Sequence, residues 1–281
     1  MKMFAAFDDY ISNQALLSYW LVLEKHTEAD MEANYQAAWK RWDLERDTET
    51  TADMAALIGN ILDFSGRYGD FTEALFRQHL EIREKVLGPE HPDTATSLNN
   101  LGEILRNKGD YDAAEPLHRR SLEIREKVLG PEHPDTAQSL NNLFLLLYAK
   151  GDYDAAEPLL RRSLEIQEKV LGPEHPDTAT SLNNLGELLN VKGDYDGAEP
   201  LFRRSLEIRE KVLGLEHPDT AASLSTLGVL LSNKGDYDGA EPLYRRSLEI
   251  REKVLGPEHP DTATTLDDLG MLLDVKGDYD G

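Results

Sequence analysis

The chain has 281 residues, 53 acidic and 30 basic, which gives a formal net charge of −23. This charge disfavours nucleic-acid binding, which needs a surplus of Lys and Arg. The absence of cysteine excludes disulfides, thiolate zinc sites and thiol nucleophiles. The longest apolar run, Leu16–Leu23, is shorter than the ~20 residues of a membrane span, so we expect a cytoplasmic protein with no membrane association.

Residues 1–48 show no visible repeat, but helices are plausible over 10–25 and 28–46. This segment holds all three tryptophans, Trp20, Trp39 and Trp42. We interpret it as an N-terminal helical cap whose aromatic side chains cover the first repeat, because the terminal repeats of stacked arrays need covering. The alternative is that these aromatic side chains form a docking surface for a partner.

The rest of the chain is a tandem repeat. The string E-H-P-D-T-A occurs five times, with its histidines 42 residues apart, and L-E-I-x-E-K-V-L-G recurs with the same period. A repeat of this length indicates a stacked array of small structural units. The predicted boundaries are a degenerate repeat at 49–90, complete repeats at 91–132, 133–174, 175–216 and 217–258, and a partial repeat at 259–281.

Each repeat reads as two antiparallel helices. In the first repeat, Pro92 and Asp93 supply helix-start chemistry, and leucines at helical spacing follow. A second helix is expected to begin at Asp112, with Glu115 three residues on as in a capping box, and to end at Gly130. No segment shows the alternation of a strand. One helix pair cannot bury its own apolar face, so the pairs must stack into an all-α solenoid.

The repeat resembles the tetratricopeptide repeat. That family's pattern W-x2-L-G-x2-Y…A-x3-F is matched by Leu98-x2-Leu101-Gly102-x2-Leu105…Ala114-x3-His118, and by the same offsets in later repeats. The period and the phrases H-P-D-T-A, L-N-N-L and A-E-P-L are similar to the kinesin-light-chain type. The resemblance implies a right-handed α-solenoid of antiparallel helix pairs, whose first helices line a concave groove that binds a peptide or helix of another protein.

The resemblance places a set of polar and apolar side chains in that groove. Asparagine suits the backbone of an extended peptide because it offers both a donor and an acceptor, although these residues could equally bond between neighbouring helices. The candidate peptide-binding residues are Asn99, Asn100, Glu103, Arg106, Asn141, Asn142, Leu145, Tyr148, Asn183, Asn184, Glu187 and Asn190. Since only Arg106 is basic, we expect a partner that is not strongly acidic.

The second repeat departs from the pattern. Phe144 stands where the other repeats have glycine, so its ring must shift the helix pair, point outward or repack the core locally. Leu145 and Tyr148 replace polar residues and offer the best apolar anchor in an otherwise polar groove.

No motif indicates catalysis or a cofactor. The single histidine of each repeat is a poor metal ligand, because neighbouring copies would lie too far apart to share an ion. The G-D-Y-D strings lack the ligand pattern of an EF-hand. We therefore expect no catalytic residue, no metal and no cofactor, and a non-enzymatic interaction scaffold.

Two other functions remain open. The chain could be the sensor or autoinhibitory segment of a larger NTPase or protease. Alternatively, it could self-associate end to end through 259–281. The sequence stops there as a second helix should begin, so we expect no covering helix for Leu266, Leu269, Met271, Leu272 and Leu273. If these residues are not covered by a second copy, we expect the chain to be a piece of a longer protein. Each complete repeat carries only two or three more acids than bases, so the net charge is mainly a scaffold property multiplied by copy number.

Overall fold

The computed structural model describes residues 69–277, and within them it contains ten α-helices and no strand. The all-α fold is confirmed for this part of the chain. The predicted cap at 1–48, with its three tryptophans, and the first half of the degenerate repeat lie outside the described residues. The chain divides into two compact units, residues 1–131 and 132–281.

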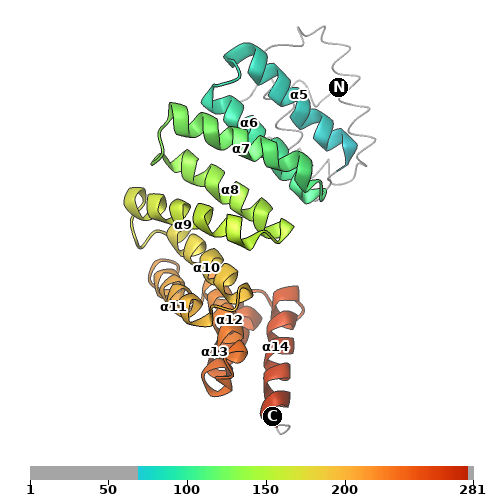
Figure 1. Ribbon diagram of the computed structural model, residues 1–281. Coiled ribbons are helices and arrows are strands. Elements are labelled where there is room, and N and C mark those ends of the chain that lie inside the picture. The colour runs from blue at the N-terminus through green and yellow to red at the C-terminus, as the bar shows by residue number, and fades with distance from the viewer. Residues whose placement is uncertain (1–68, 278–281) are drawn as a thin grey trace. The chain divides into compact units, whose positions relative to one another are not determined.

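The helices follow one another as antiparallel pairs within each unit (Figure 1). The first unit contains α5 (Asp70–Leu87), α6 (Pro92–Asn107) and α7 (Tyr111–Val128). The second contains α8 (Pro134–Lys150), α9 (Tyr153–Val170), α10 (Pro176–Val191), α11 (Tyr195–Val212), α12 (Pro218–Asn233), α13 (Tyr237–Val254) and α14 (Pro260–Lys276). Each second helix from α9 onward packs both on its own first helix and on the first helix of the next repeat.

The repeated histidine is the N-cap of every first helix from α6 onward. His91 Nδ1 accepts a hydrogen bond from the Asp93 backbone N–H at 3.2 Å, and its four copies do the same. This bond satisfies one of the N–H groups that a helix start leaves unpaired. The sequence alone predicts a start at Pro92 and Asp93, because histidine is not among the usual capping residues.

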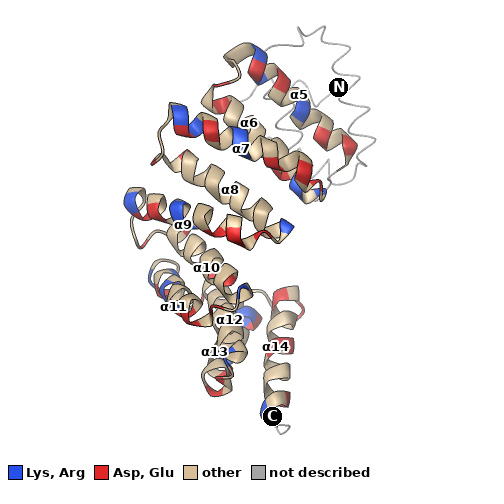
Figure 2. Cartoon of the chain, viewed as in Figure 1, with Lys and Arg blue, Asp and Glu red and all other residues tan. Residues whose placement is uncertain are grey.

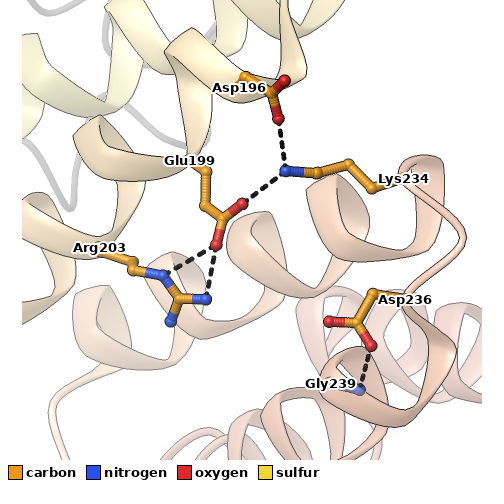
Figure 3. Close-up of polar contacts among 6 residues, drawn as sticks. All are labelled: Asp196, Glu199, Arg203, Lys234, Asp236 and Gly239. Atoms are coloured by element: carbon orange, nitrogen blue, oxygen red, sulfur yellow. Dashed lines mark hydrogen bonds and ion pairs between the residues drawn. The ribbon is translucent and has the colours of Figure 1, made fainter.

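The second helices begin earlier than the capping-box pattern predicts. The side chain of Asp110, not of Asp112, caps α7 by accepting from the Ala113 N–H at 3.2 Å. Asp112 lies within the first turn, where its negative charge faces the positive end of the helix dipole. Asp236 likewise caps α13 by accepting from the Gly239 N–H at 3.0 Å (Figure 3).

The two helices of a repeat meet where a glycine faces a ring. A Cβ atom added at Gly186 of α10 would lie 2.7 Å from Phe202 Cε1 of α11, and one at Gly228 would lie 3.0 Å from Tyr244 Cε1. Beside this contact, Ser205 Oγ donates to the Ala179 carbonyl at 2.7 Å, and Ser163 and Ser247 repeat this bond in their own pairs. Because the glycine of the first helix has no side chain, a large ring of the second helix can enter the core at this point.

In the second repeat the aromatic ring at this contact comes from the first helix instead of the second. Phe144 does not point outward, because only 2% of it is exposed, and its ring lies 5.8 Å from that of Tyr148. The position that carries Phe202 or Tyr244 in later repeats carries the smaller, fully buried Leu160. The ring has thus moved from the second helix to the first, which conserves core volume, the arrangement that cores tolerate best.

Some positions that are buried in the other first helices are exposed in α14. Leu269 and Leu272 are buried, but Leu266 is 56% exposed, whereas its copy Leu224 in α12 is fully buried. A Cβ at Gly270 would meet nothing within 4 Å. Of the five apolar residues expected to lack a covering helix, Leu266 and Met271 are the exposed ones.

Lysines at the ends of the first helices connect consecutive repeats. Lys234 Nζ lies 2.7 Å from Asp196 Oδ1 and 2.8 Å from Glu199 Oε2 of the preceding second helix (Figure 3). Lys192 and Lys276 make the same two contacts in their own repeats. Figure 2 shows that charged residues gather on the second helices, whereas α8 carries them only near its two ends. Many of the acidic residues are therefore partners within the scaffold.

Candidate functional site

The first helices of the second unit present one continuous series of half-buried positions, which we call the first-helix surface. It is defined by Leu145 and Tyr148 of α8, Glu187 and Asn190 of α10, and Val229 and Ser232 of α12. Interactions join neighbouring helices of this surface: the charge of Glu187 contributes to the raised pKa of Tyr148, and Asn233 Nδ2 at the end of α12 donates to Asn190 Oδ1 at 3.2 Å.

Tyr148 is the aromatic centre of this surface. Its ring lies 5.8 Å from the ring of Phe144 and 5.3 Å from the ring of Tyr153, both tilted, which is favourable geometry for aromatic pairs. Partial burial, with a further contribution from the charge of Glu187, raises the pKa of the Tyr148 hydroxyl. The ring is therefore held from two sides but keeps an accessible face, as an anchor for an apolar ligand side chain requires.

Glu187 is the most unusual charge on this surface. Burial raises the pKa of its carboxyl group, although Asn183 Nδ2 donates to Oε1 at 2.7 Å and the positive charge of Arg209 opposes the rise. Burial also lowers the pKa of the Arg209 guanidinium. Glu187 is the one acidic residue among the six that define this surface, so the surface is polar rather than strongly acidic.

The two asparagines of each L-N-N-L phrase lie in different surroundings. The first of the pair is buried in two repeats: Asn99 is 3% exposed and its Oδ1 lies 3.1 Å from His118 Nδ1, and Asn183 donates to Glu187. The second of each pair, Asn100, Asn142 and Asn184, is half-buried. In the first unit, Glu103 and Arg106 bond to each other, with Arg106 Nη2 2.7 Å from Glu103 Oε2.

A cleft of about 290 Å³ opens between α8, α9 and the start of α10. Asn141 and Gln167 line it, and the side-chain oxygens of both are buried without a hydrogen-bond partner. Asn141, which the sequence predicts as a groove residue, lines this cleft and stands one helical turn before Leu145. Gln167 is not singled out by the sequence analysis, although a signal exists: the four other copies of this position carry arginine.

No group of three His, Asp or Glu side chains is placed to hold a metal ion in the stretch that the structure describes. Over the same residues, no helix is both long enough and apolar enough to cross a membrane.

The geometry defines a repeat protein whose units are antiparallel helix pairs joined by ring-to-glycine contacts. The tetratricopeptide repeat family model matches residues 51–127, 98–169, 143–190, 180–253 and 227–280. The chain belongs to the tetratricopeptide repeat family. Proteins of this family are in general protein-interaction scaffolds without catalytic activity of their own.

Solved structures agree with this assignment. The chain is similar to a kinesin light chain-like protein from Podosopora anserina with nearly identical TPR-like repeats: the TM-score is 0.64 at 26% identity, covering 72% of this chain and 95% of that one. A single-residue variant of that protein gives a TM-score of 0.65 at the same identity and coverage. BtubC (BKLC) from P. vanneervenii shares the fold, with a TM-score of 0.67 at 22% identity over 88% of this chain and 94% of that chain. Among curated proteins, none matches the sequence.

Proposed function

We propose that the protein is a non-enzymatic scaffold that binds a peptide or helix of a partner protein on the first-helix surface. The observation that carries this proposal is the setting of Tyr148, whose ring is supported by Phe144 and Tyr153 and remains half-exposed beside Leu145. A rigid, partly covered ring next to an aliphatic side chain is the usual core of a protein-binding hot spot.

The polar residues around this anchor would set the direction and chemistry of the ligand. Asn142 and Asn184 each offer a donor and an acceptor to a peptide backbone. In the described part of the second unit, the first-helix surface carries one charge, that of Glu187, and no lysine or arginine. The partner segment would therefore carry apolar side chains and uncharged polar side chains, and would not be strongly acidic.

The experiment is a selection of random 16-residue peptides on the immobilised chain, followed by fluorescence anisotropy with the selected peptides. Tyr148→Ala should weaken binding at least tenfold, which corresponds to about 1.4 kcal/mol, and Asn142→Ala should weaken it less. Val212→Ala, at an exposed position of a second helix, is the control and should bind normally. Equal affinity of Tyr148→Ala, Asn142→Ala and wild-type protein would exclude this surface.

A second candidate function is self-association through residues 259–281. It is favoured by the exposure of Leu266 in α14, because the copy of this residue in α12, Leu224, is fully buried, and apolar side chains exposed where a helix normally packs often mark interfaces. Light scattering coupled to size exclusion tests it: a dimer in the wild-type protein that Leu266→Glu dissociates supports the idea. A monodisperse wild-type monomer at high protein concentration rejects it.

A further inference from the structure

Arginine occupies one position of the second helix in four of the five copies of the repeat phrase. The phrase L-E-I-x-E-K carries arginine at 83, 125, 209 and 251. Arg209 Nη1 donates to Ser223 Oγ at 2.7 Å and to the Asp219 carbonyl at 3.3 Å. Arg251 likewise donates to the Asp261 carbonyl at 2.8 Å and to the Thr265 hydroxyl. In these two repeats the side chain therefore joins the second helix to the start of the next first helix.

The second repeat has Gln167 at this position, and the cleft of about 290 Å³ lies beside it. The cleft lies at the place that the arginine side chain takes in the later repeats. Gln138 and Asp177 line it, and they stand one repeat before Thr180 and Asp219, the residues that Arg209 Nη2 and Nη1 contact at 3.5 and 3.3 Å. Glutamine is too short to fill the space that arginine fills elsewhere.

The lining of the cleft has the chemistry of a guanidinium site. Asn141 Oδ1 and Gln167 Oε1 are buried acceptors without a partner, and burial of such a group is unfavourable until a donor reaches it. Asp135 and Asp177 also line the cleft, with side chains that are exposed to solvent, and Ile166, Val170 and Leu171 provide apolar walls. A planar cation with five N–H donors on an aliphatic stem complements such a lining, whereas an anion does not.

We propose that this cleft binds an arginine side chain of a partner protein. The partner's guanidinium would donate to Asn141 and Gln167, its charge would face Asp135 and Asp177, and its methylene groups would lie on Ile166 and Val170. Lysine fits less well, because its compact ammonium has only three donors and is more strongly hydrated. Asn141 stands one helical turn before Leu145, so the site adjoins the first-helix surface, but neither Leu145 nor Tyr148 lines it.

The test uses N-acetyl-arginine amide as the probe and the isosteric, uncharged N-acetyl-citrulline amide as its comparison. We expect the arginine probe to shift the side-chain amide NMR signals of Asn141 and Gln167 saturably at millimolar concentration, and the citrulline probe to bind at least fivefold more weakly. Equal binding of the two probes, or no saturable shift by the arginine probe, would overturn the proposal.

Matched variants keep the test specific. Gln167→Arg supplies the side chain from within the chain and should abolish probe binding while raising the melting temperature. Glu165→Gln makes the same change in charge at an exposed position of the same helix and should bind like wild type. Asn141→Leu removes one acceptor and should also lose binding. Probe binding by Gln167→Arg at wild-type affinity would contradict the site.

Two further variants extend the test. Arg209→Gln places glutamine at the equivalent position of the next repeat and should create a second binding site for the arginine probe. An unchanged stoichiometry of probe binding would contradict the proposal that the missing arginine side chain creates the cleft. Tyr148→Ala should leave binding of the arginine probe unaltered. Loss of binding in this variant would mean that the probe binds the first-helix surface instead, which also overturns the proposal.

Discussion

Gly186 and Phe202 form the closest ring-to-glycine contact of the second unit: a Cβ atom on Gly186 would lie 2.7 Å from Phe202 Cε1. The two residues are brought together only when α10 and α11 pack. The glycine is therefore required by the ring of the neighbouring helix, and not by its own backbone, which is helical. Several expectations about stability depend on contacts of this kind.

Gly186→Ala should destabilise the protein. The added methyl group must displace a fully packed ring, and overpacking of this kind costs about 1–3 kcal/mol. The higher helix propensity of alanine returns about 1 kcal/mol at most, so we expect a lower urea midpoint by circular dichroism. Gly270→Ala is the control: it has the same register in α14, nothing lies within 4 Å of its Cβ, and it should stabilise. An unchanged or higher midpoint for Gly186→Ala would contradict the contact.

Exchanging Phe144 and Leu160 should reveal the reversed packing of the second repeat. Phe144→Gly alone leaves a cavity in the core and should cost about 3–5 kcal/mol or more, and Leu160→Phe alone should overpack. The double variant Phe144→Gly, Leu160→Phe recreates the arrangement of Gly186 and Phe202 and should recover most of the loss. Urea denaturation of all four proteins gives the coupling energy; strictly additive losses would show that the two side chains do not share one space.

His118 should make the stability of the first unit depend on pH. Burial lowers the pKa of its imidazole to about 4, with a smaller contribution from the charge of Arg106, whereas an unfolded histidine titrates near 6.5. Between these values the unfolded chain binds the additional proton, so stability falls as the pH falls from about 6.5 to 4, by about 3 kcal/mol in total.

The measurement is urea denaturation at a series of pH values between 4 and 7. His118→Phe should reduce the slope of stability with pH, and Phe202→His, which places an imidazole in the same register of the third repeat, should increase it. Burial lowers the pKa of His79 to about 4 as well, so a residual slope is expected in His118→Phe. An identical slope in the wild-type protein and in His118→Phe would contradict the assignment.

Lys234 should control the ionisation of Glu199. The hydrogen bond from Lys234, followed by that from Arg203, lowers the pKa of the Glu199 carboxyl, and the bonds to Asp196 and Glu199 raise the pKa of the lysine. Lys234→Met should therefore raise the pKa of Glu199, as measured by carbon-13 NMR of the side-chain carboxyl group. A carboxylate with a lowered pKa stabilises the fold above its ordinary value near 4.5, and this contribution disappears as the pH falls through the lowered pKa.

Salt provides the control for this ion pair. Both side chains are close to solvent, so the effect of Lys234 on the pKa of Glu199 should diminish at 1 M NaCl, where charges are screened within about 3 Å. Lys253→Met, a lysine paired with Glu216 instead, should leave the pKa of Glu199 unchanged. A pKa of Glu199 that does not respond to Lys234→Met would exclude the contact.

The sequence by itself determined the helices, their pairing and the family, because these follow from local chemistry. The period of 42 residues, the Leu-x2-Leu-Gly spacing and the turn residues around Gly109 and Gly130 all act within a few residues of one another. The error at Asp112 was of the same local kind, since two aspartates stand within three residues and either can cap a helix.

Only the tertiary structure decided which residues are covered, joined or accessible. Leu224 and Leu266 occupy the same place in the repeat, yet the first is fully buried and the second is 56% exposed, because burial is set by the helix that packs on each. Asn141 and Gln167 lie on different helices and form one cleft only because α8 and α9 pack together. Because the repeats are nearly identical in sequence, local patterns predict the same structure for each copy. Their differences in burial and in side-chain contacts come from the helices that pack on each copy.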